Sequence, residues 1–364
     1  MSDLSFFTLK KVSQIFGEDV HLTKSKLIEL EKNKLIPKLK QIKRGATKVK
    51  GWEPHDLPEI GEQLGFLTRP EKSLAISVFT TKGGVLKTTL SLNLARVAAL
   101  HNIKTCVVGL DVQGDITTAL GHDGEYENYS GIEDVISRID SIKGLADIFS
   151  GKSILEDVIV STDLPNLFLI PETPELVAMN DSINNINRRE FWLKDRIVDK
   201  LKQNFDLIIM DCSPNWNKLT TNALVASDAL ISPLECKINN FRNFKVFQEF
   251  LKEFKEDMSL KFDQIFIPTK FSLNKKLSLE IKDWYESNIN GCLHDGIRES
   301  VSGEEATALN ISMIEHAPNS KVAAEFKQIV KSIFEKIRAT RTDPVNNMFS
   351  FNTDSFDYNS NEIK

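Results

Sequence analysis

The sequence of 364 residues lacks several features that define whole classes of protein. No run of about 18 or more uncharged apolar residues occurs, so no segment is expected to span or anchor in a membrane. The amino-terminal residues carry no charged start, apolar stretch and small-residue cleavage site of the secretory type. No internal repeat is present. These absences predict a cytoplasmic protein of ordinary globular build.

Cysteine is scarce. The four cysteines, Cys106, Cys212, Cys236 and Cys292, show no CxxC or Cys/His spacing, so a cysteine-based metal site is not expected. Cys106 lies inside an apolar run and is predicted to be a small core residue. This usage fits a reducing cytoplasm.

The charge is unevenly distributed along the chain. The net charge is −5, but residues 1–70 contain 13 Lys and Arg against 9 Asp and Glu. A basic amino-terminal part on an acidic body suggests two roles, one of them with nucleic acid. A charged surface that serves only solubility is the alternative. The length itself favours two domains.

Residues 8–67 have the pattern of a compact helical unit. Thr8 and Gly17 bracket one helical segment, and a second begins at residues 23–26 and is expected to end at Pro37. A basic two-stranded wing around Arg44 and a third helix over 54–66 follow. We therefore predict an amino-terminal domain over residues 1–70.

From residue 71 onward, buried strands alternate with helices, which predicts an α/β fold with a doubly wound, mostly parallel sheet. The domain is expected over 71–341, with a less regular insertion at 122–160 and a mobile tail at 342–364. The expected strands are continuous apolar runs at 74–80, 104–110, 205–210, 229–234 and 264–269.

A phosphate-binding loop is predicted between the first of these strands and its helix. A strand-to-helix turn directs backbone N–H groups and the positive helix end at one point. Lys87 can reach the β- and γ-phosphates, and the Thr88 hydroxyl is placed to bind Mg²⁺. A glycine turn with surface lysines is the alternative. The residues expected to contact the nucleotide are Lys82, Gly83, Gly84, Val85, Leu86, Lys87, Thr88 and Thr89.

Two carboxylates follow apolar strands. Asp111 ends the second predicted strand and Asp211 ends the third. Ligands of doubly wound sheets bind at the carboxyl ends of strands, so both can converge on the loop. Asp211 suits an outer hold on Mg²⁺, and Asp111 suits orientation of the attacking water. Either aspartate alone is more often a turn or helix-cap residue.

These segments resemble the ParA family of partition ATPases, which carry a deviant Walker A loop. The resemblance covers roughly residues 74–335. It implies an ATPase that hydrolyses ATP to ADP and phosphate with Mg²⁺ and forms a nucleotide-dependent homodimer in which Lys82 reaches the partner's nucleotide. The motifs that carry it are KGGVLKTT at 82–89, LDVQGDITTALG at 110–121, FDLIIMDCSPNWNKLTTNALVASDALISPLEC at 205–236, and the segment at 296–333.

The sequence departs from the family at several positions. Family members usually have an acidic residue two positions before Asp111, and this chain has Gly109 there. Of the two prolines that usually follow Asp211 in the family, only the second is present, as Pro214. Leu86 stands where many members have glycine. Val112 and Asp115 stand where Pro and Asn are frequent. None of these changes removes a residue with an assigned chemical role.

The amino-terminal part resembles the winged helix-turn-helix of MerR-like regulators, which implies DNA binding. Lys24, Ser25 and Lys26 open the segment that enters the major groove in such folds. The wing supplies Lys43, Arg44 and Lys48 near the phosphates. In the ATPase part, Lys275, Lys276 and Arg298 lie where the family's nonspecific DNA contacts fall. A small helical domain with a solvated basic face is the alternative.

The predicted function is a bacterial, nucleoid-associated partition ATPase. The resemblance implies nonspecific DNA binding with ATP, stimulation by a ParB-type centromere-binding partner, and repression of its own operon through the amino-terminal domain. The polar, acidic tail lacks the basic amphipathic helix of MinD-type relatives, so no membrane partner is expected. A nucleotide-sensing transcription regulator and an ATPase that positions a protein cargo are the alternatives.

Overall fold

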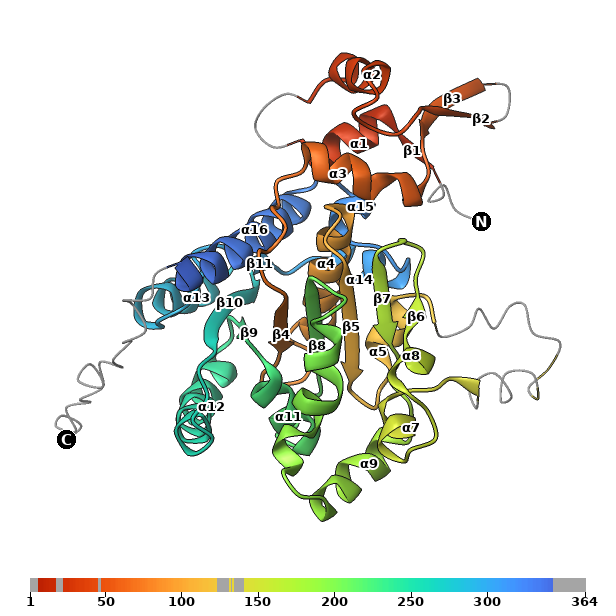
Figure 1. Ribbon diagram of the computed structural model, residues 1–364. Coiled ribbons are helices and arrows are strands. Elements are labelled where there is room, and N and C mark those ends of the chain that lie inside the picture. The colour runs from red at the N-terminus through yellow and green to blue at the C-terminus, as the bar shows by residue number, and fades with distance from the viewer. Residues whose placement is uncertain are drawn as a thin grey trace.

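Figure 1 shows the computed structural model, which describes residues 6–17, 22–44, 47–122, 131, 133 and 141–342. Residues 343–364 of the predicted tail lie outside this set, as do Gly45 at the tip of the predicted wing and parts of the predicted insertion at 122–160. A large sheet with helices on both faces forms the body of the molecule, and a smaller sheet with its own helices lies at one end (Figure 1).

The large sheet has eight strands. All neighbours pair in parallel except β6, which is antiparallel to β7. The five predicted strands are confirmed, and the doubly wound, mostly parallel arrangement is confirmed with them. The order across the sheet is β11 (Ile297–Arg298), β10 (Asp263–Phe271), β9 (Ala229–Glu235), β4 (Leu74–Val78), β8 (Leu207–Cys212), β5 (Thr105–Leu110), β7 (Leu167–Ile170) and β6 (Val160–Ser161).

The central strands are apolar on both faces because helices cover both. Ile76 and Val78 of β4 point into one apolar cluster, while Ala75 and Phe79 point into the other. This alternation follows from the period of two residues along a strand, and it explains the continuous apolar runs in the sequence. Cys106 is fully buried in the second cluster, as predicted.

Helices cover both faces of the large sheet (Figure 1). The helices of each face contribute apolar residues to one cluster. The first face is covered by α4 (Lys87–Leu100), α5 (Asp115–Ala119), α14 (Val301–Ala308), α15 (Met313–His316) and α16 (Lys321–Thr342). The second is covered by α7 (Leu145–Phe149), α8 (Leu155–Val158), α9 (Leu176–Ser182), α10 (Asp199–Leu201), α11 (Lys218–Ala226), α12 (Ile238–Asp257) and α13 (Lys276–Asn288).

Residues 6–67, which we call the head, have the three predicted helices and the two predicted strands, together with a short strand, β1, that was not predicted. Thr8 and Thr23 cap α1 and α2 through hydrogen bonds from the backbone amides three residues later. One expectation was wrong: α2 ends at Lys32 rather than at Pro37, because Lys34 has a left-handed φ of 58°. The elements are β1 (Phe7–Thr8), α1 (Leu9–Phe16), α2 (Lys24–Lys32), β2 (Lys40–Arg44), β3 (Thr47–Trp52) and α3 (Leu57–Leu64), with sheet order β1-β3-β2.

The head packs on the carboxyl end of α4. Gly61 of α3 lies so close to α4 that a Cβ atom there would be 1.8 Å from the Leu100 carbonyl oxygen. Asn102 donates a hydrogen bond of 2.7 Å to Glu62, and the Lys327 ammonium of α16 donates one of 2.6 Å to the Gln14 carbonyl. The head therefore shares one continuous apolar cluster with the first face of the sheet.

No helix within the described part of the chain is both long enough and apolar enough to cross a membrane.

Candidate functional site

The predicted phosphate loop joins the end of β4 to the start of α4. Gly84 has a φ of 71°, which favours glycine, and a Cβ atom at Gly83 or Gly84 would meet nothing within 4 Å. The two glycines thus leave an open cradle at the amino end of α4. Leu86, the N-cap of that helix, also has a left-handed φ of 75°. This is a conformation that favours glycine.

Lys87 crosses beneath the loop. Its ammonium group donates a hydrogen bond of 3.0 Å to the Lys82 carbonyl, and the side chain is buried. Burial lowers the pKa of Lys87, while the carboxyl groups of Asp211 and Asp111 oppose this effect. A desolvated cation next to an open cradle suits a phosphate ligand.

Thr88 and Asp211 meet although they are far apart in sequence. The Thr88 hydroxyl donates a hydrogen bond of 2.9 Å to Asp211 Oδ2, and Ser91 of the same helix donates to Asp211 Oδ1. Burial raises the pKa of Asp211 to about 6, although the hydrogen bonds from Ser91 and Thr88 oppose it. The arrangement places a carboxylate directly behind a hydroxyl at the loop.

Asp111 lies at the carboxyl end of β5, beside the loop. It is half-buried, its Oδ1 accepts a hydrogen bond of 3.3 Å from the Gln113 amide, and burial raises its pKa. Lys87, Thr88 and Asp111 line one cavity of about 580 Å³. The structure thus brings the predicted loop and both predicted aspartates together, with Asp211 underneath Thr88.

Lys82 turns away from the cavity. Its ammonium group contacts the Asn240 side-chain oxygen and lies 3.3 Å from Glu235 Oε2. Glu235 ends β9 and Asn240 lies in the first turn of α12, and both are buried. Asn240 also donates a hydrogen bond of 2.6 Å to Glu235 Oε2. This contact could not be predicted from local sequence, because the partners lie more than 150 residues from Lys82.

Glu172 is a buried carboxyl group that the sequence analysis missed. Its oxygens accept hydrogen bonds from the backbone amides of Asp111 and Thr117. Burial raises the pKa of Glu172 to about 8, and the charge of Asp211 adds to the effect. The available signal was the apolar run at 167–170, which Glu172 follows just as Asp111 follows its own strand.

Lys270 was missed as well. It lines the same cavity from the end of β10, and its backbone has a left-handed φ of 51°.

The site fits a magnesium-bound nucleoside triphosphate. The cradle over Gly83 and Gly84 is open, Lys87 supplies a cation, and Thr88 with Asp211 supplies a hydroxyl and a carboxylate of the kind that Mg²⁺ prefers. Val85 and Thr89, also predicted to contact the nucleotide, belong to the same loop and first helical turn, with Val85 buried.

The residues predicted to contact DNA lie in three places. Lys24, Ser25 and Lys26 are exposed at the start of α2, and Lys43 lies opposite Lys48 in the β2–β3 ribbon. Arg44 ends β2, and its side chain lies outside the described part.

The three predicted DNA contacts of the body differ in their surroundings. Lys275 and Lys276 are exposed at the start of α13, and Lys276 lies 3.3 Å from Glu280. Arg298 is held in the fold, because its Nε donates a hydrogen bond of 2.6 Å to Glu325 of α16.

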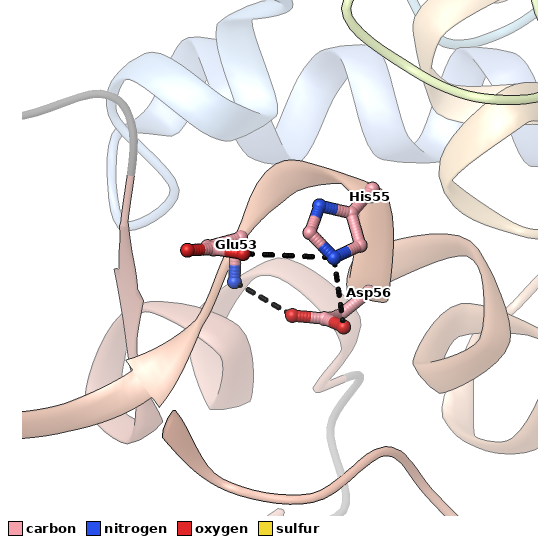
Figure 2. A group of neighbouring side chains, drawn as sticks. All are labelled: Glu53, His55 and Asp56. Carbon is pink, nitrogen blue, oxygen red and sulfur yellow. Dashed lines mark hydrogen bonds and ion pairs between the residues drawn. The ribbon is translucent and has the colours of Figure 1, made fainter. Parts of the chain in front are cut away.

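A cluster of Glu53, His55 and Asp56 beside the wing brings three metal-type ligands together (Figure 2). The ammonium group of Lys40 lies 2.6 Å from Glu53 Oε2 and 2.9 Å from Asp56 Oδ2. It also lies 2.9 Å from His55 Nε2. Lys40 therefore supplies the cation that this cluster requires, and we assign no metal to it.

Comparisons with known proteins agree with this geometry. The sequence model of the AAA_31 family, described as "AAA domain", matches residues 73–264. The sporulation initiation inhibitor protein Soj of Bacillus subtilis is 35% identical over 162 residues, which are 44% of this chain and 58% of Soj. The chain thus spans little more than half the length of this curated relative.

Two solved structures show the same fold. One is described as cobyrinic acid a,c-diamide synthase from Mycobacterium smegmatis with bound ADP and magnesium; it is 21% identical, covers 75% of this chain and 98% of its own, and has a TM-score of 0.60. The other is a putative plasmid partition protein from Borrelia burgdorferi bound to AMPPNP, with 21% identity, coverage of 73% and 100%, and a TM-score of 0.58. The family model matches residues 73–264 of this chain, which include the phosphate loop, so the chain belongs to the AAA_31 family, as a relative of the ParA and Soj P-loop ATPases.

Proposed function

We propose that this protein is a DNA-partition ATPase that uses ATP and Mg²⁺. The observation that carries the proposal is the hydrogen bond between Thr88 and Asp211. It lies next to the phosphate loop, to which Lys87 also donates a hydrogen bond. This set supports phosphate binding and phosphoryl transfer to water. The likeness to the chromosome partitioning protein ParA of Caulobacter vibrioides, which is 31% identical over 170 residues, supports the choice of DNA segregation among the functions that such a site can serve.

The residues of the site have distinct roles in this proposal. The loop amides and Lys87 bind and orient the phosphates, and Thr88 and Asp211 hold the metal. Magnesium, when bound, neutralises charge on the phosphates. Asp111, at the cavity wall, orients the attacking water. Positioning and electrostatic stabilisation together account for most of the catalysis of phosphoryl transfer.

Two copies of the chain would complete the site. We infer that ATP favours a homodimer in which Lys82 leaves Glu235 and Asn240 and reaches the nucleotide of the partner. A cation supplied across the interface stabilises transition-state charge and links hydrolysis to assembly. Lys82 is the candidate because its ammonium is held at the rim of the site by two side chains rather than within the cavity.

DNA binding would involve both parts of the chain. We propose that residues 1–70 form a winged helix-turn-helix domain that binds an operator and represses the protein's own operon, while the ATPase domain, residues 71–341, binds nonspecific DNA of the nucleoid. Lys43 and Lys48 support this, since like charges directly opposite each other in a ribbon are unfavourable without an anionic partner. A ParB-type partner would stimulate hydrolysis and release the dimer from DNA.

The proposal is tested by binding to nonspecific duplex DNA with ATP, ADP or no nucleotide, at moderate salt, for wild type and Lys87→Ala. We expect tight, salt-sensitive binding with ATP alone, and its loss in the variant because the phosphates lose their cation. Binding that ignores nucleotide and is confined to one promoter would instead identify a transcription regulator with a nucleotide sensor.

Asp111→Ala gives a second test. The variant should bind ATP and accumulate as an ATP-bound dimer on DNA, with turnover reduced by about a hundredfold, because the attacking water is no longer oriented. Asp257→Ala, at the last residue of α12, is the matched control. Rapid hydrolysis by Asp111→Ala would contradict the role of this carboxylate.

A further inference from the structure

Glu172 lies directly behind Asp111, between the ends of β5 and β7. Its Oε1 accepts a hydrogen bond of 3.1 Å from the Asp111 amide, and its Oε2 accepts bonds of 3.3 and 3.2 Å from the Thr117 amide and hydroxyl. The Thr117 hydroxyl in turn accepts a bond of 2.9 Å from the Glu172 amide. One carboxyl group thus joins two backbone amides, those of Asp111 and Thr117, and the Thr117 hydroxyl.

These contacts fix both ends of a segment that forms one wall of the cavity. Residues 111, 112, 113 and 115 line the cavity. Asp111 begins this segment and Thr117 lies in α5, just beyond it. Holding both amides on one side chain sets the position of the Asp111 carboxylate relative to the loop. No other described carboxyl group bonds to these two amides.

Glycine at position 109 makes room for this side chain. A Cβ atom at Gly109 would lie 2.2 Å from Cγ and 2.7 Å from Cδ of Glu172. An aspartate at 109 would therefore place its own Cβ near the present Cγ, and its carboxyl carbon near the present Cδ. Side chains at positions 109 and 172 would therefore occupy the same space, and an acidic residue at either position can place a carboxyl group there.

We propose that Glu172 is a positioning residue for hydrolysis, which holds Asp111 and the wall at 111–117 by filling the space that Gly109 leaves open. This inference rests on the proposed function, because Asp111 is given its role there. Glu172 acts on catalysis through Asp111, because Asp111 lines the cavity and Glu172 is not among the described residues that line it. A residue that only stabilised the fold would weaken nucleotide binding and turnover together.

The test compares Glu172→Ala, Gly109→Asp and the double variant Gly109→Asp/Glu172→Ala, with the exposed Glu175→Gln as matched control. Steady-state ATP hydrolysis gives kcat and KM for each. For Glu172→Ala we expect kcat to fall at least about tenfold while KM changes less than about threefold. The double variant should recover most of the lost kcat, because the carboxylate returns to the same space from the neighbouring strand.

Amide hydrogen exchange of the same proteins gives a readout that does not depend on turnover. Exchange at the Asp111 and Thr117 amides should quicken in Glu172→Ala and slow again in the double variant. Unchanged exchange at these amides in Glu172→Ala, or a double variant no better than Glu172→Ala, would overturn the inference. If wild type hydrolyses no ATP with DNA present, the proposed function fails and Glu172 has no role in hydrolysis, even where the exchange data confirm its contacts.

Discussion

Leu86 adopts a backbone conformation that ordinarily favours glycine, yet its side chain packs partly against the first apolar cluster. A left-handed φ costs a non-glycine residue about 1–2 kcal/mol. Leu86→Gly removes this cost together with the side-chain contact, whereas Leu86→Ala removes the contact and keeps the cost.

We therefore expect Leu86→Gly to be more stable than Leu86→Ala by about 1 kcal/mol in urea unfolding. This order is the reverse of the usual one within helices, where glycine is less favourable than alanine. The control is position 98 in the interior of α4, where wild type has alanine. There we expect wild type to be more stable than Ala98→Gly, which is the usual order. An alanine variant more stable than the glycine variant at position 86 would show that the loop relaxes.

Glu172 also predicts a dependence of stability on pH. Burial raises its pKa from 4.5 to about 8 in the folded protein. Between these values the unfolded chain releases a proton that the folded chain retains, so folding becomes less favourable as pH rises. Glutamine has no such proton.

The free energy of unfolding of wild type, minus that of Glu172→Gln, should thus fall by at least about 1 kcal/mol between pH 5 and pH 8. Urea unfolding without nucleotide at four pH values measures it. A difference that stays constant with pH would mean that Glu172 is ionised in the folded protein throughout this range.

At the scale of elements, α4 connects two sites. Its first turn carries Lys87 and Thr88, and the carbonyl of its last residue, Leu100, contacts α3 of the head. With 14 residues at about 1.5 Å each, the helix spans about 21 Å. A displacement of α4 by a bound phosphate would reach the head directly, without a flexible connection.

Gly61→Ala should separate these two helices. The added Cβ atom would clash with backbone, which cannot rotate away, so we expect a loss of at least about 2 kcal/mol of unfolding free energy. Glu59→Ala, exposed on the same helix, should change the stability by less than about 0.5 kcal/mol. Urea unfolding compares the two. Equal stability of both variants would indicate that the head can move away from α4 without cost.

The β2–β3 ribbon places Lys43 and Lys48 side by side. If the ribbon contacts DNA phosphates, Lys43→Gln and Lys48→Gln should each weaken duplex binding and lower the slope of log affinity against log salt by about one. Stability should stay the same or rise slightly, because a like-charge pair is removed. Lys72→Gln, exposed between head and body, is the control, and a slope equal to that of wild type in the wing variants would remove the ribbon from the DNA surface.

At the scale of the whole molecule, the contact of Lys82 with Asn240 and Glu235 opposes the proposed dimer. A hydrogen bond to a charged group contributes about 1.5–3 kcal/mol. Asn240→Ala should therefore lower the ATP concentration needed for half-maximal dimerisation by about tenfold, as measured by analytical ultracentrifugation. Lys82→Ala removes the contact with Asn240 and Glu235, and it also removes the proposed contact with the partner's nucleotide. This variant should therefore not dimerise. An unchanged midpoint in Asn240→Ala would show that Lys82 leaves its pocket without cost.

Much of this molecule could be predicted because local patterns determine it. Five strands of the sheet are continuous apolar runs, and Asp111 and Asp211 each follow one, so their convergence on the loop could be predicted from the fold alone. Strand β7 is a run of only four residues within an irregular stretch, and Glu172 was missed with it.

The rest depends on pairs of distant residues. The contact between Lys82 and Glu235 requires knowing that β9 pairs with β4, and the position of the head requires knowing which face of α3 meets α4. Neither of these can be predicted from the local spacing of apolar residues in the sequence. The caps at Thr8 and Thr23 could be predicted, because a helix start depends only on its neighbouring residues.

The close approach of Gly61 to Leu100 has a consequence for protein engineering. Residues 68–70 are the obvious place at which to exchange heads between relatives, since they join the two parts in sequence. A transplanted head would, however, have to present a residue without a side chain where Gly61 now meets the carbonyl of Leu100. Chimeras of this protein are therefore better designed by transferring α3 and the carboxyl-terminal turn of α4 as a matched pair.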